Sequence, residues 1–228
     1  MRKQLGKLTR RFMSERTILY LRFDWLRFRA RCSVRGRRGL ESPSKKLHLG
    51  CGSRHVNGWL NIDVRGSDFD VDLANLPLPW KDDCFESVVS QQVIEHLDLR
   101  LELVPLLRDL FRMAKSGAEL WLCCPDLEKA CRAYAVDHGL TLYQDALTRG
   151  GIVLPEGMPV QHYINDLFHQ DGSHKNLYDL ELMTWALESA GFSNCERVTE
   201  GEMLNRFSEF PPRRDDVQSI YIRAIKPK

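Results

Sequence analysis

The sequence predicts an α/β fold with a mostly parallel sheet, an antiparallel last strand and a basic N-terminal arm. From residue 46 onward, short apolar runs alternate with segments of helical periodicity, which implies a parallel sheet with right-handed crossovers. The first run leads directly into Gly50-Cys51-Gly52, a turn that lets the backbone come close to a ligand. The last run, 217–225, follows a connection with Pro211-Pro212 and little helical pattern, so we expect it to return antiparallel.

Seven strands and four helices are expected after the arm. Apolar or alternating runs predict strands at 46–50, 59–63, 69–72, 86–90, 118–124, 194–199 and 217–225. Helical periodicity predicts helices at 98–114, 127–136, 140–148 and 179–190. Because Pro105 is costly inside a helix, we expect the first helix to begin near it. Asp179 is placed to cap the last helix, and Gly191 is placed to end it.

The arm at 1–45 differs in charge from the domain predicted at 46–228. Residues 1–40 hold 13 Lys and Arg against two acids, a net charge of +11, whereas all later residues together carry −9. Apolar side chains recur in the arm at spacings of three, four or seven, which predicts an amphipathic basic helix. The residues of this stripe are Leu5, Leu8, Phe12, Leu19, Phe23, Leu26 and Ala30.

Three interpretations of the arm stay open. It is a solvated tail, an interfacial helix on an anionic membrane surface, or a nucleic-acid-binding segment, and the third is less favoured than the first two. Large side chains that would insert into a bilayer beside the arginines are Phe12, Tyr20, Phe23, Trp25 and Phe28. The expected contact region is residues 1–40.

Cysteine usage and hydropathy favour a reduced, cytoplasmic protein. The seven cysteines contain no Cys-x-x-Cys pair and no spacing typical of zinc. No apolar run approaches the roughly 20 residues of a membrane-spanning helix. The apolar run at 18–21 is shorter than the apolar core of a signal peptide, about 7–15 residues. We expect a peripheral position at the inner membrane face if the arm binds lipid.

Acidic residues follow three predicted strands. A carboxylate at the tip of the second strand is able to accept both hydroxyls of a ribose, and Asp63 stands there. Asp72, followed by Leu73, would accept from the exocyclic amine of adenine or would cap a turn. The pair Glu95-His96 follows the fourth strand. These positions predict a nucleotide pocket at the carboxyl edge of the sheet.

Taken together, the motifs resemble those of class I S-adenosylmethionine-dependent methyltransferases, in the subgroup with a short first crossover. The resemblance spans residues 46–225 and implies a Rossmann-like methyltransferase fold. It rests on the segments 47–52, 58–63, 72–73, 76–86, 93–97, 115–120, 125–127, 174–179 and 190–192.

The resemblance implies S-adenosyl-L-methionine as the cofactor. The glycine turn would pass beneath its methionine portion, and Asp63 would hold its ribose. Asp72 and Leu73 would flank the adenine, and Gln91 would lie near the sulfonium. The residues implied in cofactor binding are therefore Gly50, Cys51, Gly52, Asp63, Asp72, Leu73 and Gln91.

Several positions depart from the family pattern. His48 stands where the first strand often carries an acid, and Ser53 stands where a third glycine is usual. The crossover at 53–58 is too short for a full helix, which reduces the dipole stabilisation of the methionine carboxylate. Arg54 or a backbone amide would take over that contact.

Because the sulfonium is already activated, the protein has to position the acceptor and often to supply one base. His96 and then Asp126 are the candidates, since each leaves the carboxyl end of a strand. For His96 the alternative is a structural hydrogen bond at a helix start. The lid histidines His162, His169 and His174 fit no compact ligand pair, so no metal site is predicted.

Segment 126–178 is unusually long for a strand–helix connection and is rich in His and Gly. Long connections of this kind are often lids or binding loops, so we expect it to form the acceptor side of the pocket.

The predicted function is methyl transfer from S-adenosylmethionine to an oxygen or nitrogen of a small-molecule, glycan or lipid-linked acceptor. One alternative is a nicotinamide-dependent oxidoreductase, which would need glycine where the chain has His55. A second alternative is a non-catalytic methyltransferase-like partner protein, because the departures at His48 and Ser53 affect the cofactor motif.

Overall fold

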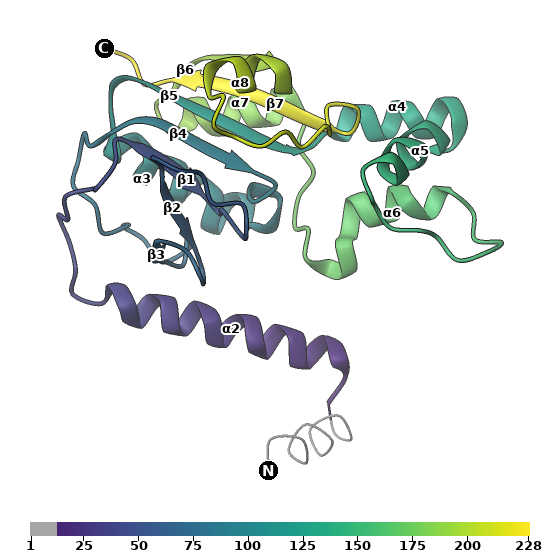
Figure 1. The fold of residues 1–228 in the computed structure, drawn as a ribbon, viewed down its shortest axis with the longest axis horizontal. Helices are drawn as coiled ribbons and strands as arrows, with labels where there is room; N and C mark the ends of the chain where they lie inside the picture. Colours follow the sequence, from purple (N-terminus) through teal and green to yellow (C-terminus); the bar gives the residue numbers. More distant parts are fainter. Residues whose placement is uncertain (1–12) are drawn as a thin grey trace.

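The computed structural model describes residues 13–228 and contains a seven-stranded sheet with helices on both faces (Figure 1). The strands are β1 (Lys46–Leu49), β2 (Leu60–Asp63), β3 (Phe69–Asp70), β4 (Phe85–Gln91), β5 (Ala114–Pro125), β6 (Ser193–Val198) and β7 (Ser219–Ile225). Their order is β3-β2-β1-β4-β5-β7-β6. Strands β1 to β5 pair in parallel, and β7 is antiparallel to β5 and β6. The seven predicted strands and the antiparallel last strand are confirmed.

The helices of the described residues include all four that the sequence predicts. They are α2 (Glu15–Val34), η1 (Ile94–His96), η2 (Leu99–Leu103), α3 (Val104–Met113), α4 (Leu127–Asp137), α5 (Leu140–Thr148), α6 (Gln161–His169), η3 (Gln170–Gly172), α7 (Leu180–Ser189) and α8 (Glu200–Arg206). Pro105 lies in the first turn of α3, as expected. Asp179 caps α7 by accepting a hydrogen bond from the amide of Leu182 at 2.8 Å. The sequence did not predict α6 or α8.

The sheet separates two apolar layers. Along β5, Leu120 and Leu122 face the layer that contains α3 and α7, whereas Trp121 and Cys123 face the layer that contains Met203 of α8. This alternation follows from the two-residue period of a strand. Both faces of the central strands are covered, so even polar side chains such as His48 and Ser90 are buried there.

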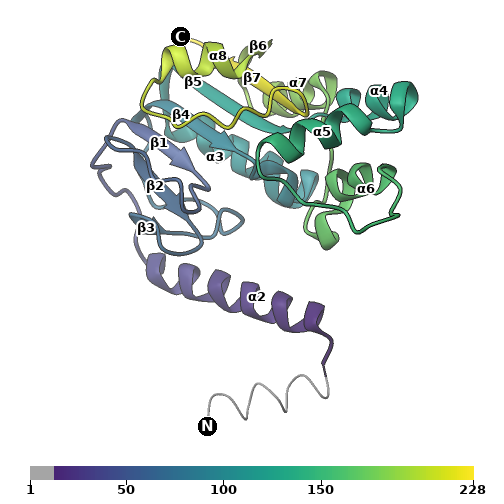
Figure 2. The ribbon, with the colours of Figure 1, turned by 45° about the vertical axis from the view of Figure 1, so that its right-hand side comes forward.

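Helices α4, α5 and α6 form a separate cluster beyond the carboxyl end of β5 (Figures 1 and 2). They have a small core of their own, made by Ala130, Leu142, Ala146, Tyr163, Ile164 and Leu167. The predicted segment 126–178 is therefore mostly helical. Its role as a lid stays a prediction.

Helix α2 runs beneath the sheet, from the region of β3 toward the end of α6 (Figure 2). At one end, the Ser33 hydroxyl donates to the carbonyl of Asp70 at 2.8 Å. At the other end, the Tyr20 hydroxyl donates to the carbonyl of Gly172 at 3.5 Å. The arm is thus in contact with the domain, and the boundary at residue 45 stays a prediction.

The amphipathic stripe predicted for the arm is only partly buried. Ala30 is buried and Leu26 is half-buried, but Leu19 and Phe23 are 63% and 50% exposed. The remaining stripe residues, Leu5, Leu8 and Phe12, lie outside the described residues. Within residues 13–228, none of the helices combines the length and the apolar character that crossing a membrane requires.

Candidate cofactor and active site

The glycine turn after β1 is held tightly on one side and open on the other. The amides of Gly50 and Cys51 both donate to the carbonyl of Ile62, at 2.8 and 3.1 Å. Gly50 has φ +65°, and a Cβ there would lie 2.3 Å from Cγ2 of Val93. Gly52 also has positive φ, but a Cβ there would meet nothing within 4 Å. Only glycine therefore fits at Gly50, and the open space beside Gly52 is available to a ligand.

Asp63, at the tip of β2, is tied to this turn. One carboxylate oxygen accepts from the amide of Gly52 at 2.8 Å, and the other accepts from the amide of Val64 at 2.6 Å. The residue is partly exposed, and each oxygen keeps a further lone pair. The carboxylate is thus fixed beside the glycine turn with capacity to bind two hydroxyls.

Asp72 is in contact with α2. Its Oδ2 accepts from Arg27 Nε at 3.0 Å and from Arg31 Nε at 2.7 Å, and its Oδ1 accepts from the amide of Ala74. The turn-capping alternative for Asp72 is therefore present, and two arginines of the arm hold one oxygen of the residue predicted to flank adenine. Leu73 is buried beside it in the main apolar core.

Gln91 and Arg54 lie on the side of the sheet that carries α8. The Gln91 amide group donates to the sulfur of Met203 at 3.5 Å. Arg54 donates through one terminal nitrogen to the carbonyl of Pro211 at 2.8 Å, while its Nε is buried without a partner. An unpaired buried donor next to the glycine turn is suited to a carboxylate ligand, as expected for Arg54.

The sequence did not identify Gln92, the neighbour of Gln91, as important. Gln92 has φ +58°, and its side chain donates to Asp215 at 3.2 Å and to Ser219 at 2.9 Å. Asp215 also accepts from the Tyr221 hydroxyl at 2.5 Å. This network fixes the loop before β7 against the end of β4. A glutamine whose backbone has positive φ has no recognisable sequence pattern.

His96 lies in η1, directly after β4, and is partly exposed. Its Nδ1 is 3.1 Å from the carbonyl of Ser173, and its ring stacks edge-on against His174 at 4.9 Å between ring centroids. Burial lowers the pKa of both His96 and His174. The lowered pKa favours the neutral form of His96. The hydrogen bond predicted as its structural alternative is present, and it uses only one ring nitrogen.

Glu95 precedes His96 and is 1% exposed. Its Oε2 has no hydrogen-bond partner, and burial raises the pKa of Glu95 to about 8. The carboxylate oxygen and one nitrogen from each of His96 and His174 lie within 4.8 Å of one another. The sequence analysis grouped His174 with His162 and His169 instead.

The contacts of Asp126 argue against its predicted catalytic role. One oxygen caps α4 by accepting from the amides of Glu128 and Lys129, and the other accepts from Arg197 at 2.5 Å. The side chain is 0% exposed. The carboxylate has both oxygens engaged and no exposed surface, so it acts as a helix cap and an ion-pair partner, and its catalytic role stays a prediction.

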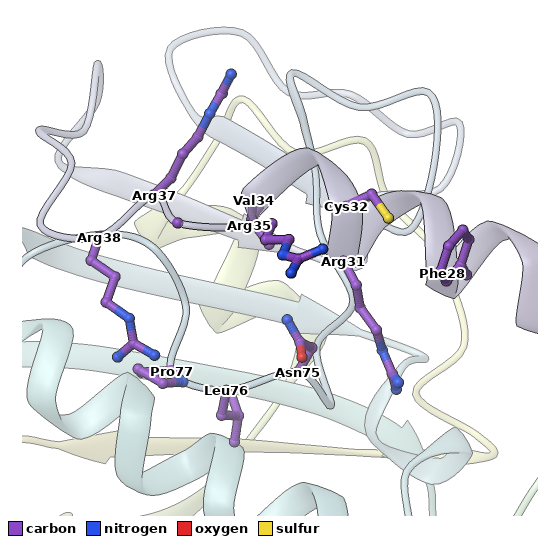
Figure 3. Close-up of a pocket in the computed structure, with 11 residues that line it drawn as sticks. Phe28, Arg31, Cys32, Val34, Arg35, Arg37, Arg38, Asn75, Leu76 and Pro77 are labelled. Atoms are coloured by element: carbon purple, nitrogen blue, oxygen red, sulfur yellow. The ribbon is translucent and has the colours of Figure 1, made fainter.

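A basic cavity of about 380 Å³ lies at the end of α2, away from the glycine turn (Figure 3). Four arginines contribute to its walls together with the turn at 75–77. Figure 3 shows that Arg37 points away from this turn, whereas Arg38 reaches toward Pro77. The lining residues are Phe28, Arg31, Cys32, Val34, Arg35, Gly36, Arg37, Arg38, Asn75, Leu76 and Pro77.

No protein-family model matches the sequence, and the comparison with curated proteins finds no match. Among solved structures, phosphoethanolamine N-methyltransferase 2 of Haemonchus contortus in complex with S-adenosyl-L-methionine is similar at 12% identity and a TM-score of 0.43. That match covers 88% of this chain and 52% of the other.

Two further structures are similar over most of both chains. A methyltransferase of Thermotoga maritima, described as a possible histamine N-methyltransferase, has 15% identity and a TM-score of 0.45, with 96% and 98% coverage. A SAM-dependent methyltransferase of Archaeoglobus fulgidus has 17% identity and a TM-score of 0.42, with 97% and 99% coverage. The strand order and antiparallel β7 of this chain, taken by themselves, confirm the predicted fold: it is the Rossmann-like fold of class I S-adenosylmethionine-dependent methyltransferases.

Proposed function

We propose that the chain binds S-adenosylmethionine at the carboxyl edge of β1, β2 and β4 and transfers its methyl group to an acceptor. The observation that carries this proposal is the glycine turn fixed by Asp63 and open beside Gly52. The Asp63 carboxylate would bind the two ribose hydroxyls, and Arg54 Nε would bind the methionine carboxylate. Leu73 and Asp72 would border the adenine, and Gln91 would lie near the sulfonium.

The cofactor supplies an activated methyl group on its sulfonium sulfur. The protein has to hold an acceptor oxygen or nitrogen in line with that group and to remove a proton. His96 is the base we favour, because its Nδ1 donates to the Ser173 carbonyl and its Nε2 keeps a lone pair. Burial lowers the pKa of His96 and so favours the neutral ring, the form in which a general base has to start.

The acceptor proposed is a small molecule, a glycan or a lipid-linked precursor. The helices α4 to α6 would form its side of the pocket, since His174 and Ser173 at the end of that segment contact His96.

Calorimetry tests the cofactor assignment. S-adenosylhomocysteine should bind to the full-length protein, and Asp63→Ala should weaken binding by about 1–3 kcal/mol because two hydroxyls lose their acceptor. Asp82→Ala, which changes a carboxylate that is 69% exposed and far from the turn in sequence, is the matched control. Binding of NAD without S-adenosylhomocysteine would favour the oxidoreductase instead. Unchanged affinity in Asp63→Ala would remove Asp63 from the ribose role.

A second candidate is a non-catalytic, methyltransferase-like partner protein. The observation that favours it is the pair of arginines on Asp72, which occupy the oxygen proposed for adenine. A protein of this kind would bind neither S-adenosylhomocysteine nor NAD in the same calorimetric experiment.

We also propose that α2 places the protein at an anionic membrane surface, on the cytoplasmic side. Large apolar side chains are exposed along this basic helix, and the basic cavity lies at its end. Insertion of such side chains and attraction of arginines to acidic headgroups act together in interfacial helices. The exposed residues are Leu19, Tyr20, Leu21, Phe23, Trp25 and Phe28.

A further inference from the structure

Three side chains of types that bind metals come together from two segments that are distant in sequence. Glu95 and His96 belong to η1, and His174 follows η3. One ligand atom from each lies within 4.8 Å of the other two. Val93, two residues before Glu95, is the residue that packs against Gly50. Glu95 and His96 therefore follow closely, in sequence, the residue that packs against the glycine turn proposed to bind the cofactor.

The hydrogen bonds of the two imidazoles fix which nitrogen is available. Nδ1 of His96 lies 3.1 Å from the Ser173 carbonyl, and Nδ1 of His174 lies 2.7 Å from the Leu167 carbonyl. A carbonyl only accepts, so both Nδ1 atoms carry the proton, and in a neutral ring Nε2 is left with its lone pair. Metal-binding histidines commonly show this arrangement, in which a backbone carbonyl orients the ring.

The Glu95 carboxylate gives an independent indication of a cation. Its Oε2 is buried and has no hydrogen-bond partner among the described residues. Leaving a buried acceptor unsatisfied is costly, and a buried carboxylate is normally paired or bound to a metal.

The backbone holds the two segments together. The amide of Lys175 donates to the carbonyl of Glu95 at 2.8 Å, and the amide of Asn176 donates to the same carbonyl at 3.3 Å. The Asn176 side chain donates to the carbonyl of Leu97 at 2.7 Å. Because both flanking segments are fixed, only small side-chain rotations would bring the ligand atoms to the roughly 3–4 Å separation that one shared ion requires.

We propose that Glu95, His96 and His174 bind one divalent transition-metal ion, with zinc as the reference ion. Two imidazole nitrogens and one carboxylate oxygen are a donor set typical of zinc and related ions, and magnesium prefers oxygen alone. Three protein ligands leave a coordination position open. An acceptor oxygen would occupy that position, a clause that rests on the proposed function, and His96 would then be a ligand instead of a base.

Metal binding is measured on the full-length protein after treatment with a chelator and dialysis. Calorimetry with zinc chloride should give one equivalent bound, and cobalt chloride should give the visible absorption of a low-coordinate site. Magnesium chloride should bind at least tenfold more weakly. Glu95→Gln and His174→Gln should each weaken zinc binding about 100-fold or more, since loss of an outer partner alone costs 10–100-fold.

The matched control is His162→Gln, a histidine of the same segment that lies outside the cluster. It should bind zinc as the wild type does. Thermal unfolding of each variant without metal verifies folding. No zinc binding by the wild type, or unchanged binding in folded His174→Gln, would overturn the proposal. Zinc binding without S-adenosylhomocysteine binding would support the metal site and contradict the proposed function. S-adenosylhomocysteine binding without zinc binding would contradict the metal site and support the proposed function.

Discussion

Arg27 of α2 and Asp72 of the loop after β3 form an ion pair with 3.0 Å between Nε and Oδ2. The Asp72 side chain is 5% exposed, and Arg27 also donates to Glu102 at 3.1 Å. The positive arm and the negative domain are therefore joined by specific contacts at the predicted adenine site. Access to Asp72 depends on where α2 lies.

Replacing Arg27 by Ala should lower the free energy of unfolding by about 1–2 kcal/mol, because two carboxylates lose a charged donor. Chemical denaturation measures the change. Arg29→Ala, which removes an exposed arginine of the same helix, should change stability by less than about 0.5 kcal/mol. Equal effects of the two substitutions would show that α2 does not depend on this ion pair.

Gly50→Ala should lower the free energy of unfolding by more than about 2 kcal/mol, since it combines positive φ with a clash against Val93. The double variant Gly50→Ala with Val93→Ala should recover part of that loss. Gly52→Ala has the same backbone strain without the clash and should cost only about 1–2 kcal/mol. No recovery in the double variant would place the strain elsewhere.

His48 should make the fold sensitive to acid. It is buried, its Nδ1 lies 3.1 Å from Asn61 Oδ1, and burial lowers the pKa of His48 to about 4. Above the ordinary pKa of about 6.5, His48 is neutral in both states and carries no penalty. Between about pH 6.5 and 4 the unfolded chain binds a proton that the native chain excludes, so stability should fall by on the order of 3 kcal/mol.

Urea denaturation of His48→Gln at several pH values tests this. The variant should lose that part of the slope of stability against pH, whatever its absolute stability. His55→Gln, at an exposed position seven residues later, should keep the wild-type slope. A wild-type slope in folded His48→Gln would assign the acid sensitivity to other groups.

Membrane binding should depend on the exposed face of α2. Phe23 and Trp25 are 50% and 59% exposed, so Phe23→Ser with Trp25→Ser should reduce sedimentation with phosphatidylserine vesicles about tenfold or more. Leu101→Ser changes a side chain that is 79% exposed on another element and should have no effect. Binding to RNA instead of vesicles would assign the arm to nucleic acid, and binding to neither would make it a solvated tail.

The strands were predictable because they are short apolar or alternating runs with clear boundaries. Helix α6 was missed because Val160 precedes it without a side-chain cap. Helix α8 was missed although Thr199 and Glu202 form a capping box, a signal readable from the sequence. The apolar and alternating runs of the strands and the periodicity of the other helices were sufficient to predict most of the fold.

The site was predictable only where its parts are local. The glycine turn and Asp63 belong to adjacent elements, and the structure brings them together as expected. The approach of His174 to His96 depends on how residues 126–178 fold, and no local pattern reports it. The contact of Arg27 and Arg31 with Asp72 was not predictable, because the two arginines lie 45 and 41 positions from it and no local pattern links them.

The independent core of α4 to α6 has a consequence for how this protein could diversify. Its members, among them Leu142 and Ile164, pack on one another and not into the two layers beside the sheet. Substitutions there would destabilise this cluster with little effect on the two layers beside the sheet. A different segment in the place of α4 to α6 would therefore leave the sheet and its two layers unchanged.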